Sequence, residues 1–246
     1  MMPKPRLRKV RTALRRLRRS ASGVAMLEFA LSMPFFLTAG VWGIETANFA
    51  VINMKVGQMA VHIADNASRI GDTSMLENRA IYEADINDLL VGANEQGGSR
   101  LNFFEHGRAI ISSLELYREA DHCIDGTCPA TAATEDEQFI HWQRCLGKKN
   151  ATSGYGDAGD VMPNGIGPAG REVMALPGES TIFVELFYDY QPLVTNMFIR
   201  DTTIHSIGSF TVRSDRDLTQ IYQRDETSPD PVASCTTFDN PYAPVP

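Results

Sequence analysis

The sequence predicts an α+β fold in which a long N-terminal helix, transmembrane and then amphipathic, precedes a β-rich soluble domain with an antiparallel sheet. Three observations support this prediction. Residues 24–44 form an apolar run with one carboxylate, Glu28. An apolar stripe at helical spacing continues that run. Short segments rich in β-branched and aromatic residues then recur between residues 100 and 215, and such segments are typical of strands.

The first 23 residues form a basic leader. Nine of the 23 Lys and Arg residues lie within residues 1–19, which contain no acid. The other 14 basic and 30 acidic residues give the remainder of the chain a net charge of −16. Basic patches often bind nucleic acid, but this one adjoins an apolar run. It therefore predicts the cytoplasmic flank of a membrane segment, and the acidic remainder argues against a nucleic-acid partner.

Residues 24–71 are predicted to form one long helix. The run 24–44 is long enough to cross a bilayer, which needs about 20 apolar residues. Beyond it, apolar residues recur at steps of three and four, as in an amphipathic helix. This stripe consists of Ile52, Val56, Met59, Ile63, Ala67 and Ile70.

Residues 72–226 are predicted to form the soluble α+β domain. A helix is expected over 74–94, where Ser74 and Glu77 match a capping box. Strands are expected within 100–118, 139–145, 180–194 and 205–215, and a glycine-rich loop over 147–170. Residues 227–246 form a Pro-rich C-terminal tail, which a disulfide at Cys235 would hold in place.

Four cysteines follow the apolar run, at Cys123, Cys128, Cys145 and Cys235. An even number beyond a membrane segment predicts disulfides in an oxidising compartment. Three pairings are possible, and the sequence does not choose among them. Free buried thiols and a metal knuckle at Cys123 and Cys128 are the alternatives. We expect no metal and no cofactor.

Glu28 needs an explanation, because a carboxylate within a membrane segment costs roughly 2.5–3.5 kcal/mol on insertion scales. A plain anchor has no use for such a charge. Cleavage between Gly23 and Val24 would create an amine at a similar depth. The carboxylate of one subunit could then pair with the new amine of its neighbour and set the register of an array.

The residues around this site resemble a known family. A basic leader, Gly23, the segment VAMLEF with Glu28 and Phe29, a Leu/Pro-rich run and then Glu45 occur in order. This stretch resembles TadE-like pseudopilins of the tight-adherence (Flp) type IV pilus system. The resemblance covers residues 23–70, about a fifth of the chain. The leader and soluble domain are longer than in the smallest members, so a TadF- or TadG-like role stays open.

The resemblance implies a structural role and not an enzymatic one. A prepilin peptidase would cut after Gly23 and leave a minor pilin in the bacterial inner membrane, with its C-terminal domain in the periplasm. The implied partners are other pilins and pseudopilins, the inner-membrane assembly platform and the membrane itself. Incorporation into an extracellular pilus is implied as well. No nucleic acid and no small-molecule substrate is expected.

Two further features of the helix bear on this role. Glu45 lies at the far end of the apolar run, where we expect the membrane interface to hydrate it. Ala39, Gly43 and Ala47 are four residues apart and form a small-residue stripe, which would let helices approach closely.

Other functions remain open from the sequence alone. Small residues at Thr38–Gly40 offer a signal-peptidase site, and cutting there would release a periplasmic binding domain without a pilus role. An anchored binding domain is a related alternative. Catalysis has weak support, because the five histidines (His62, His106, His122, His141 and His205) are dispersed along the sequence and no hydrolase or nucleotide-binding motif is present.

Overall fold

A computed structural model describes residues 22–71, 79–123, 133–194, 199, 202–212 and 216–241. The basic leader and the predicted capping box at Ser74 and Glu77 lie outside these described residues. The chain divides into two compact units. The N-terminal unit comprises the chain up to Asn48 together with Pro192–Ile199, and the second unit, here called the sheet domain, comprises Phe49–Gln191 and the residues from 200 onward.

Helix α2 (Ser22–Ala67) is continuous over 46 residues and includes Pro34, which confirms the predicted long helix. Its length is roughly 70 Å at 1.5 Å per residue. Polar side chains in its first half bond to their own helix: the hydroxyls of Ser32, Thr38 and Thr46 donate to carbonyls three or four residues earlier. Within the described part of the chain, this helix alone is long and apolar enough to cross a membrane.

The second half of α2 contributes to the core of the sheet domain. The predicted stripe is confirmed from Ile52 to Ala67, since all five of its helical members are buried. Ala60 and Ala64 are fully buried beside it. Ile70 lies beyond the end of the helix and is only half-buried.

The helix predicted over 74–94 is wrong in its first part. Residues 79–82 form strand β1 (Arg79–Tyr82), and helix α3 runs from Glu83 to Gly97. Strand β1 pairs in parallel with β6 (Arg216–Tyr222), a distant partner that local sequence does not reveal. At the start of α3 the Tyr82 amide donates to the Asp85 carboxylate, which satisfies a backbone group just before the helix.

The predicted antiparallel sheet is present and has four strands in the order β3-β2-β4-β5. The strands are β2 (Gly107–Leu116), β3 (Gln138–Leu146), β4 (Thr181–Asp189) and β5 (Thr203–Thr211). Two short helices precede and follow β2, namely α4 (Phe103–His106) and α5 (Glu119–His122). The strand structure predicted within 100–118 is therefore wrong for residues 103–106, which form a helical turn.

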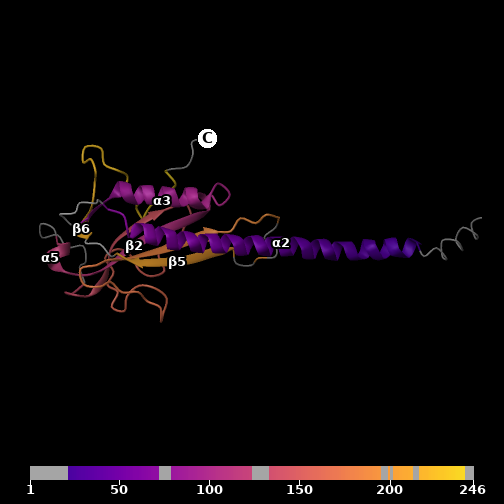
Figure 1. The fold of residues 1–246 in the computed structure, drawn as a ribbon, viewed down its shortest axis with the longest axis horizontal. Coiled ribbons are helices and arrows are strands. Elements are labelled where there is room, and N and C mark those ends of the chain that lie inside the picture. Colours follow the sequence, from indigo (N-terminus) through magenta and orange to yellow (C-terminus); the bar gives the residue numbers. More distant parts are fainter. Residues whose placement is uncertain are drawn as a thin grey trace, which may run out of the picture. The chain divides into compact units, whose positions relative to one another are not determined.

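Different elements cover the two faces of this sheet. On one face α3 runs beside the second half of α2 (Figure 1), and the guanidinium of Arg144 on β3 pairs with the buried carboxylate of Glu83 on α3. On the other face, the long loop after β3 contributes Ile166 and Ala175 to a core cluster with Phe183. Both faces are covered, which explains why β4 is buried along almost its whole length.

Gly208 on β5 marks the closest approach of helix and sheet. A Cβ atom added to Gly208 would lie 2.6 Å from the Ala60 carbonyl oxygen of α2. One helical turn earlier, Gly57 faces the Ser206 hydroxyl. Small residues on both elements therefore allow the helix backbone to lie directly on the sheet, and that contact fixes the position of α2 within this domain.

The C-terminal tail is tied to β2 and β3. Cys145 and Cys235 form a disulfide across 90 residues. The guanidinium of Arg108, fully buried on β2, donates to the carbonyls of Gly147, Cys235 and Thr237 at 2.8–3.0 Å and lies 4.1 Å from the Phe238 ring centroid. Cys123 is also disulfide-bonded, while Cys128 lies outside the described residues. The disulfide prediction is thus confirmed for three cysteines.

The outer side of β3 is hydrogen-bonded to other segments near both of its ends. The Ile140 amide donates to the Asp160 carbonyl at 2.9 Å, and the Met162 amide of the loop donates to the Gln138 carbonyl at 2.7 Å. Further along, the Cys145 amide donates to the Ala233 carbonyl of the tail at 2.8 Å. Loop and tail together satisfy backbone groups near both ends of this edge strand.

Replacing Gly208 by alanine should destabilise the sheet domain. The new methyl group meets the Ala60 carbonyl, and overpacking of this kind costs about 1–3 kcal/mol. At roughly 2–4 °C per kcal/mol for a domain of this size, the midpoint of thermal unfolding followed by circular dichroism should fall by several degrees. Gly92→Ala on α3 is the matched control, because its Cβ meets no atom within 4 Å, and it should leave the midpoint unchanged or slightly higher.

Removing the tail disulfide with Cys235→Ser should lower the stability of the domain by about 2–5 kcal/mol, because the bond closes a long loop in the unfolded chain. Urea unfolding at equilibrium measures this loss, and limited proteolysis should cut the tail first. The Cys145→Ser/Cys235→Ser double variant should match the single variant. An unchanged unfolding midpoint in both would show that Arg108 and its hydrogen bonds hold the tail without the disulfide.

Candidate functional site

The predicted processing site lies at the very start of α2. Gly23 and Val24 are the second and third residues of the helix, and both are exposed. Glu28 and Phe29 follow one turn later and are exposed as well. Among the described residues, the Glu28 carboxylate has no hydrogen bond or ion pair. The residues predicted for cleavage and register are therefore accessible on one helix end.

The first half of α2 exposes most of its large apolar side chains. Phe35 is 79% exposed and Met26 74%. The others with more than half of their surface exposed are Val24, Leu27, Phe29, Leu31, Phe36, Leu37, Trp42 and Ile44. Such a continuous apolar surface on a described element predicts lipid or protein contact.

The predicted small-residue stripe lies within this surface. Ala39, Gly43 and Ala47 are all exposed, and their spacing of four places them on one face of the helix. A Cβ atom added to Gly43 would meet nothing within 4 Å. The stripe is thus uncovered in this single chain and available to another helix.

Glu45 differs from the expectation that the membrane interface hydrates it. Its carboxylate is fully buried and accepts hydrogen bonds from the backbone amides of Leu193 and Val194 at 3.1 and 3.0 Å. These three residues belong to the N-terminal unit. The segment that follows β4 supplies the donors, and hydropathy patterns along the sequence could not place it beside Glu45.

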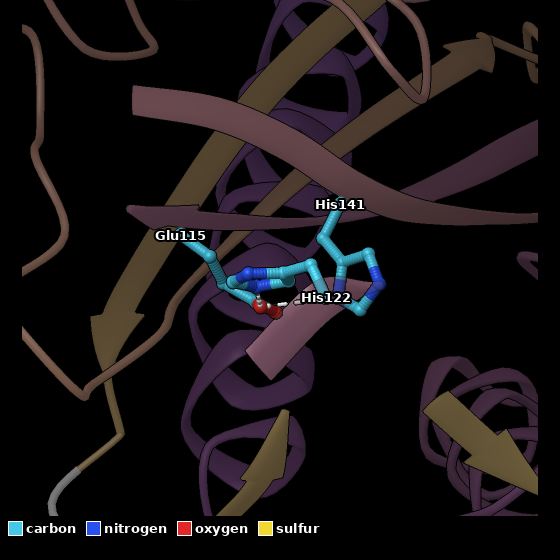
Figure 2. Close-up of side chains that lie close together, drawn as sticks. All are labelled: Glu115, His122 and His141. Atoms are coloured by element: carbon cyan, nitrogen blue, oxygen red, sulfur yellow. Dashed lines mark hydrogen bonds and ion pairs between the residues drawn. The ribbon is translucent and has the colours of Figure 1, made fainter. Parts of the chain in front are cut away.

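A buried cluster of one carboxylate and two imidazoles lies at one end of the sheet. Glu115 comes from β2, His122 from α5 and His141 from β3, and Figure 2 shows both imidazoles directed at the Glu115 carboxylate. The pairing between β2 and β3 leaves out His141, because Ser113 pairs with Trp142 and Leu114 pairs with Ile140. His141 is thus the extra residue of a β-bulge, a feature that redirects side chains.

Every oxygen of this carboxylate is hydrogen-bonded. One oxygen accepts from His122 Nε2 at 2.9 Å and from His141 Nδ1 at 3.0 Å. The other accepts from the Ser113 hydroxyl at 2.6 Å. His122 Nδ1 lies 3.1 Å from the Arg118 amide and 3.0 Å from its carbonyl. The exposed fraction of each side chain is at most 8%.

Burial and hydrogen bonding act in opposite directions on the charges of this cluster. Burial alone would raise the pKa of Glu115, but hydrogen bonds from His122, His141 and Ser113 outweigh it and lower this pKa to about 2. Burial likewise opposes the charge of His122, yet the adjacent Glu115 carboxylate raises the pKa of His122 above its ordinary value. Both shifts favour the charged forms of these two side chains relative to their ordinary pKa values.

Arg216 connects this cluster electrostatically with the end of α2. Its guanidinium, buried on β6, donates to the carbonyls of Ala67 and Ile70 at 3.1 and 3.0 Å and so caps the C-terminal end of the helix. Burial lowers the pKa of Arg216 to about 10, although the negative charge of Glu115 opposes this effect.

Although the five histidines are dispersed along the sequence, the fold brings His122 and His141 together. They are 19 residues apart, and neither forms a metal-binding or catalytic motif with a neighbour in sequence. A bulge and a four-residue helix bring them together, and neither can be recognised from periodicity. The local signal is the alternation of Ser113 and Glu115 on one face of strand β2.

A second buried carboxylate, Glu185, lies on the opposite face of the sheet. It is fully buried and accepts hydrogen bonds from the Ser153 hydroxyl and the Gly154 amide. His205 Nε2 lies 3.5 Å from it, and the His205 ring stacks on Phe187. One imidazole at this distance, with loop donors on both oxygens, makes this a satisfied core carboxylate.

Comparison of the chain with known protein families, with characterised proteins and with solved structures finds no match in any of the three. Inference about function therefore depends on the chain's own sequence and geometry.

The ion pair of Glu115 and His122 predicts a pH-dependent stability. The contribution of Glu115 is present above its ordinary pKa of 4.5 and is lost as the pH falls toward 2. The contribution of His122 is present below 6.5 and is lost as the pH rises through its elevated pKa. Removing one partner of such a buried pair costs about 3–5 kcal/mol.

Glu115→Gln should therefore destabilise the protein most between pH 4.5 and 6.5, and less below pH 3. Thermal unfolding of this variant and the parent across pH, in buffer with a chelator, measures the difference. His205→Gln serves as control and should show no such maximum. A constant difference between Glu115→Gln and the parent at every pH would contradict the ion pair.

Proposed function

We propose that the protein is a pilin-like assembly subunit of the TadE type, cut before Val24 by a prepilin peptidase and held in the bacterial inner membrane by residues 24–44. The supporting observation is the division of α2 into two chemically different halves. In the first half, most large apolar side chains are exposed. In the second half, the apolar stripe from Ile52 to Ala67 is buried in the sheet domain, and only Val51, Met54 and Val61 keep a large exposed apolar surface.

The exposed half needs an apolar environment. Leaving apolar surface in water costs about 25 cal/mol per Å², so ten large apolar side chains would be unfavourable in solution. A bilayer removes this cost before assembly, and neighbouring helices remove it afterwards. The uncovered stripe of Ala39, Gly43 and Ala47 suits close helix contact in either environment.

The two carboxylates of the N-terminal unit support a role between subunits. Glu45 is buried and bonded to backbone amides of its own chain. Glu28 has no such partner among the described residues and is exposed on the apolar half. A charge retained there calls for a partner, and the amine of a cleaved neighbouring subunit at Val24 would supply one.

The sheet domain suits a periplasmic location. Its tail is held by a disulfide, and disulfides persist in oxidising compartments. We therefore propose an inner-membrane protein with a cytoplasmic N-terminus and a periplasmic domain. The proposed partners are the peptidase, other pilins and pseudopilins and the assembly platform. We propose neither a catalytic role nor nucleic-acid binding.

A membrane-anchored binding domain without a pilus role is the second candidate. The same exposed apolar half favours it, because any single-pass anchor needs such a surface. The two candidates differ in the role of Glu28, because a plain anchor does not need this carboxylate. TadF- and TadG-like subunits share the features on which the pilin-like proposal depends.

Substitution of Glu28 distinguishes the two candidates. Glu28→Gln should insert into the membrane and still be cut, but filaments should be lost from the cell surface, because the carboxylate is needed between subunits. Intact-mass analysis with N-terminal sequencing, with and without the peptidase, should give a start at Val24 only when the peptidase is present. Electron microscopy of the same cells measures filaments.

Ser32→Ala, one turn further along the exposed helix, is the matched control and should assemble normally. Normal filaments with Glu28→Gln would refute the register role. A start near Val41 would indicate a secreted domain, and an uncut chain would indicate a plain anchor.

A further inference from the structure

Glu115, His122 and His141 present the donor atoms of a metal site. Each offers one ligand atom, and these atoms all lie within 4.8 Å of one another. Two imidazole nitrogens and one carboxylate oxygen form a common protein ligand set for zinc and neighbouring divalent ions. We propose that these three residues form a binding site for a zinc-like divalent cation in the sheet domain.

Two of the three distances between donor atoms are close to those that a tetrahedral ion requires. With Zn–N and Zn–O bonds of about 2.0–2.2 Å, neighbouring ligand atoms lie about 3.3–3.5 Å apart. The carboxylate oxygen now lies 2.9 and 3.0 Å from the two imidazole nitrogens. The two imidazole nitrogens lie within 4.8 Å of each other. Rotation of the imidazole rings toward each other, together with a shift of a few tenths of an ångström at the carboxylate oxygen, would admit the ion.

The surroundings of the ligands also suit a metal. A metal-bound imidazole commonly donates its second N–H to a backbone carbonyl, and His122 Nδ1 lies 3.0 Å from the Arg118 carbonyl. The second oxygen of Glu115 is held by the Ser113 hydroxyl. These contacts leave His122 Nε2 and His141 Nδ1 both directed at the same oxygen of the Glu115 carboxylate (Figure 2).

The donor set favours zinc over calcium or magnesium. Those harder ions require six or more oxygen ligands or an octahedron rich in water, and a site with at most 8% exposure of its side chains offers neither. His141 is the most exposed of the three. A fourth ligand such as water would therefore enter from its side.

A bound ion would fix α5 to the sheet. This helix has only four residues, too few to be stable alone, and it leads directly into the disulfide-bonded Cys123. Metal binding would join α5, β2 and β3 at one point and replace the protons that now hold the carboxylate between the two rings. The site is independent of the proposed role of α2.

The test uses the full-length protein purified in detergent, stripped with a chelator and then titrated with zinc chloride. We expect one zinc per chain, and at a hundredfold excess over the dissociation constant a rise of about 5–10 °C in the unfolding midpoint. Cobalt chloride should give the visible absorption of a tetrahedral ion with nitrogen and oxygen ligands. No binding, or a spectrum of octahedral cobalt, would overturn the proposal.

Variants assign the bound ion to these residues. His141→Gln and His122→Gln should each weaken zinc binding at least tenfold and abolish the tetrahedral spectrum, with circular dichroism confirming that they fold. His205→Gln, which removes the histidine beside the buried Glu185, should bind zinc as the parent does. Equal binding by His141→Gln and the parent would place the ion elsewhere and overturn the proposal.

Discussion

The contact between α2 and β5 at Ala60 and Gly208 is the constraint on which the sheet domain depends. Because no side chain separates the two backbones there, the apolar stripe from Ile52 to Ala67 can reach the sheet along its length. The same placement brings the last carbonyls of the helix to Arg216. A bulkier residue at position 208 would disturb the core and the helix cap together.

Buried carboxylates recur in this molecule, and each is satisfied by different donors. Glu45 accepts from two backbone amides, Glu115 from two imidazoles and a hydroxyl, and Glu185 from a hydroxyl and an amide. Leaving any of them unpaired would be costly at low dielectric. Against this pattern the exposed Glu28 stands out, since the described chain provides it with no donor.

The long elements could be predicted from the sequence because their signals are local. The stripe from Ile52 to Ala67 and the strands β3 and β4 follow from periodicity and residue type alone. Strand β1 could not be predicted in this way, because its stability comes from β6, more than 130 residues away. The burial of Glu45 could not be predicted either, because its hydrogen-bond donors lie in the segment after β4.

The Glu–His cluster illustrates a further limit of sequence analysis. Its geometry depends on one inserted residue, His141, and on one short turn of helix. A shift of the bulge by a single position would turn the imidazole to the other face of β3. Patterns of spacing between ligands cannot detect such a site, because its ligands belong to three elements joined by loops of unrelated length.

The covered outer side of β3 has a consequence for the association of the protein with other chains. An uncovered edge strand can template pairing with other chains and so promote aggregation. Here the loop at Asp160 and the tail at Ala233 occupy that edge, and the Cys145–Cys235 bond retains the tail. A chain that folds before oxidation, as in the reducing cytoplasm, would expose part of this edge. Oxidation of Cys145 and Cys235 would therefore protect the chain from association through β3.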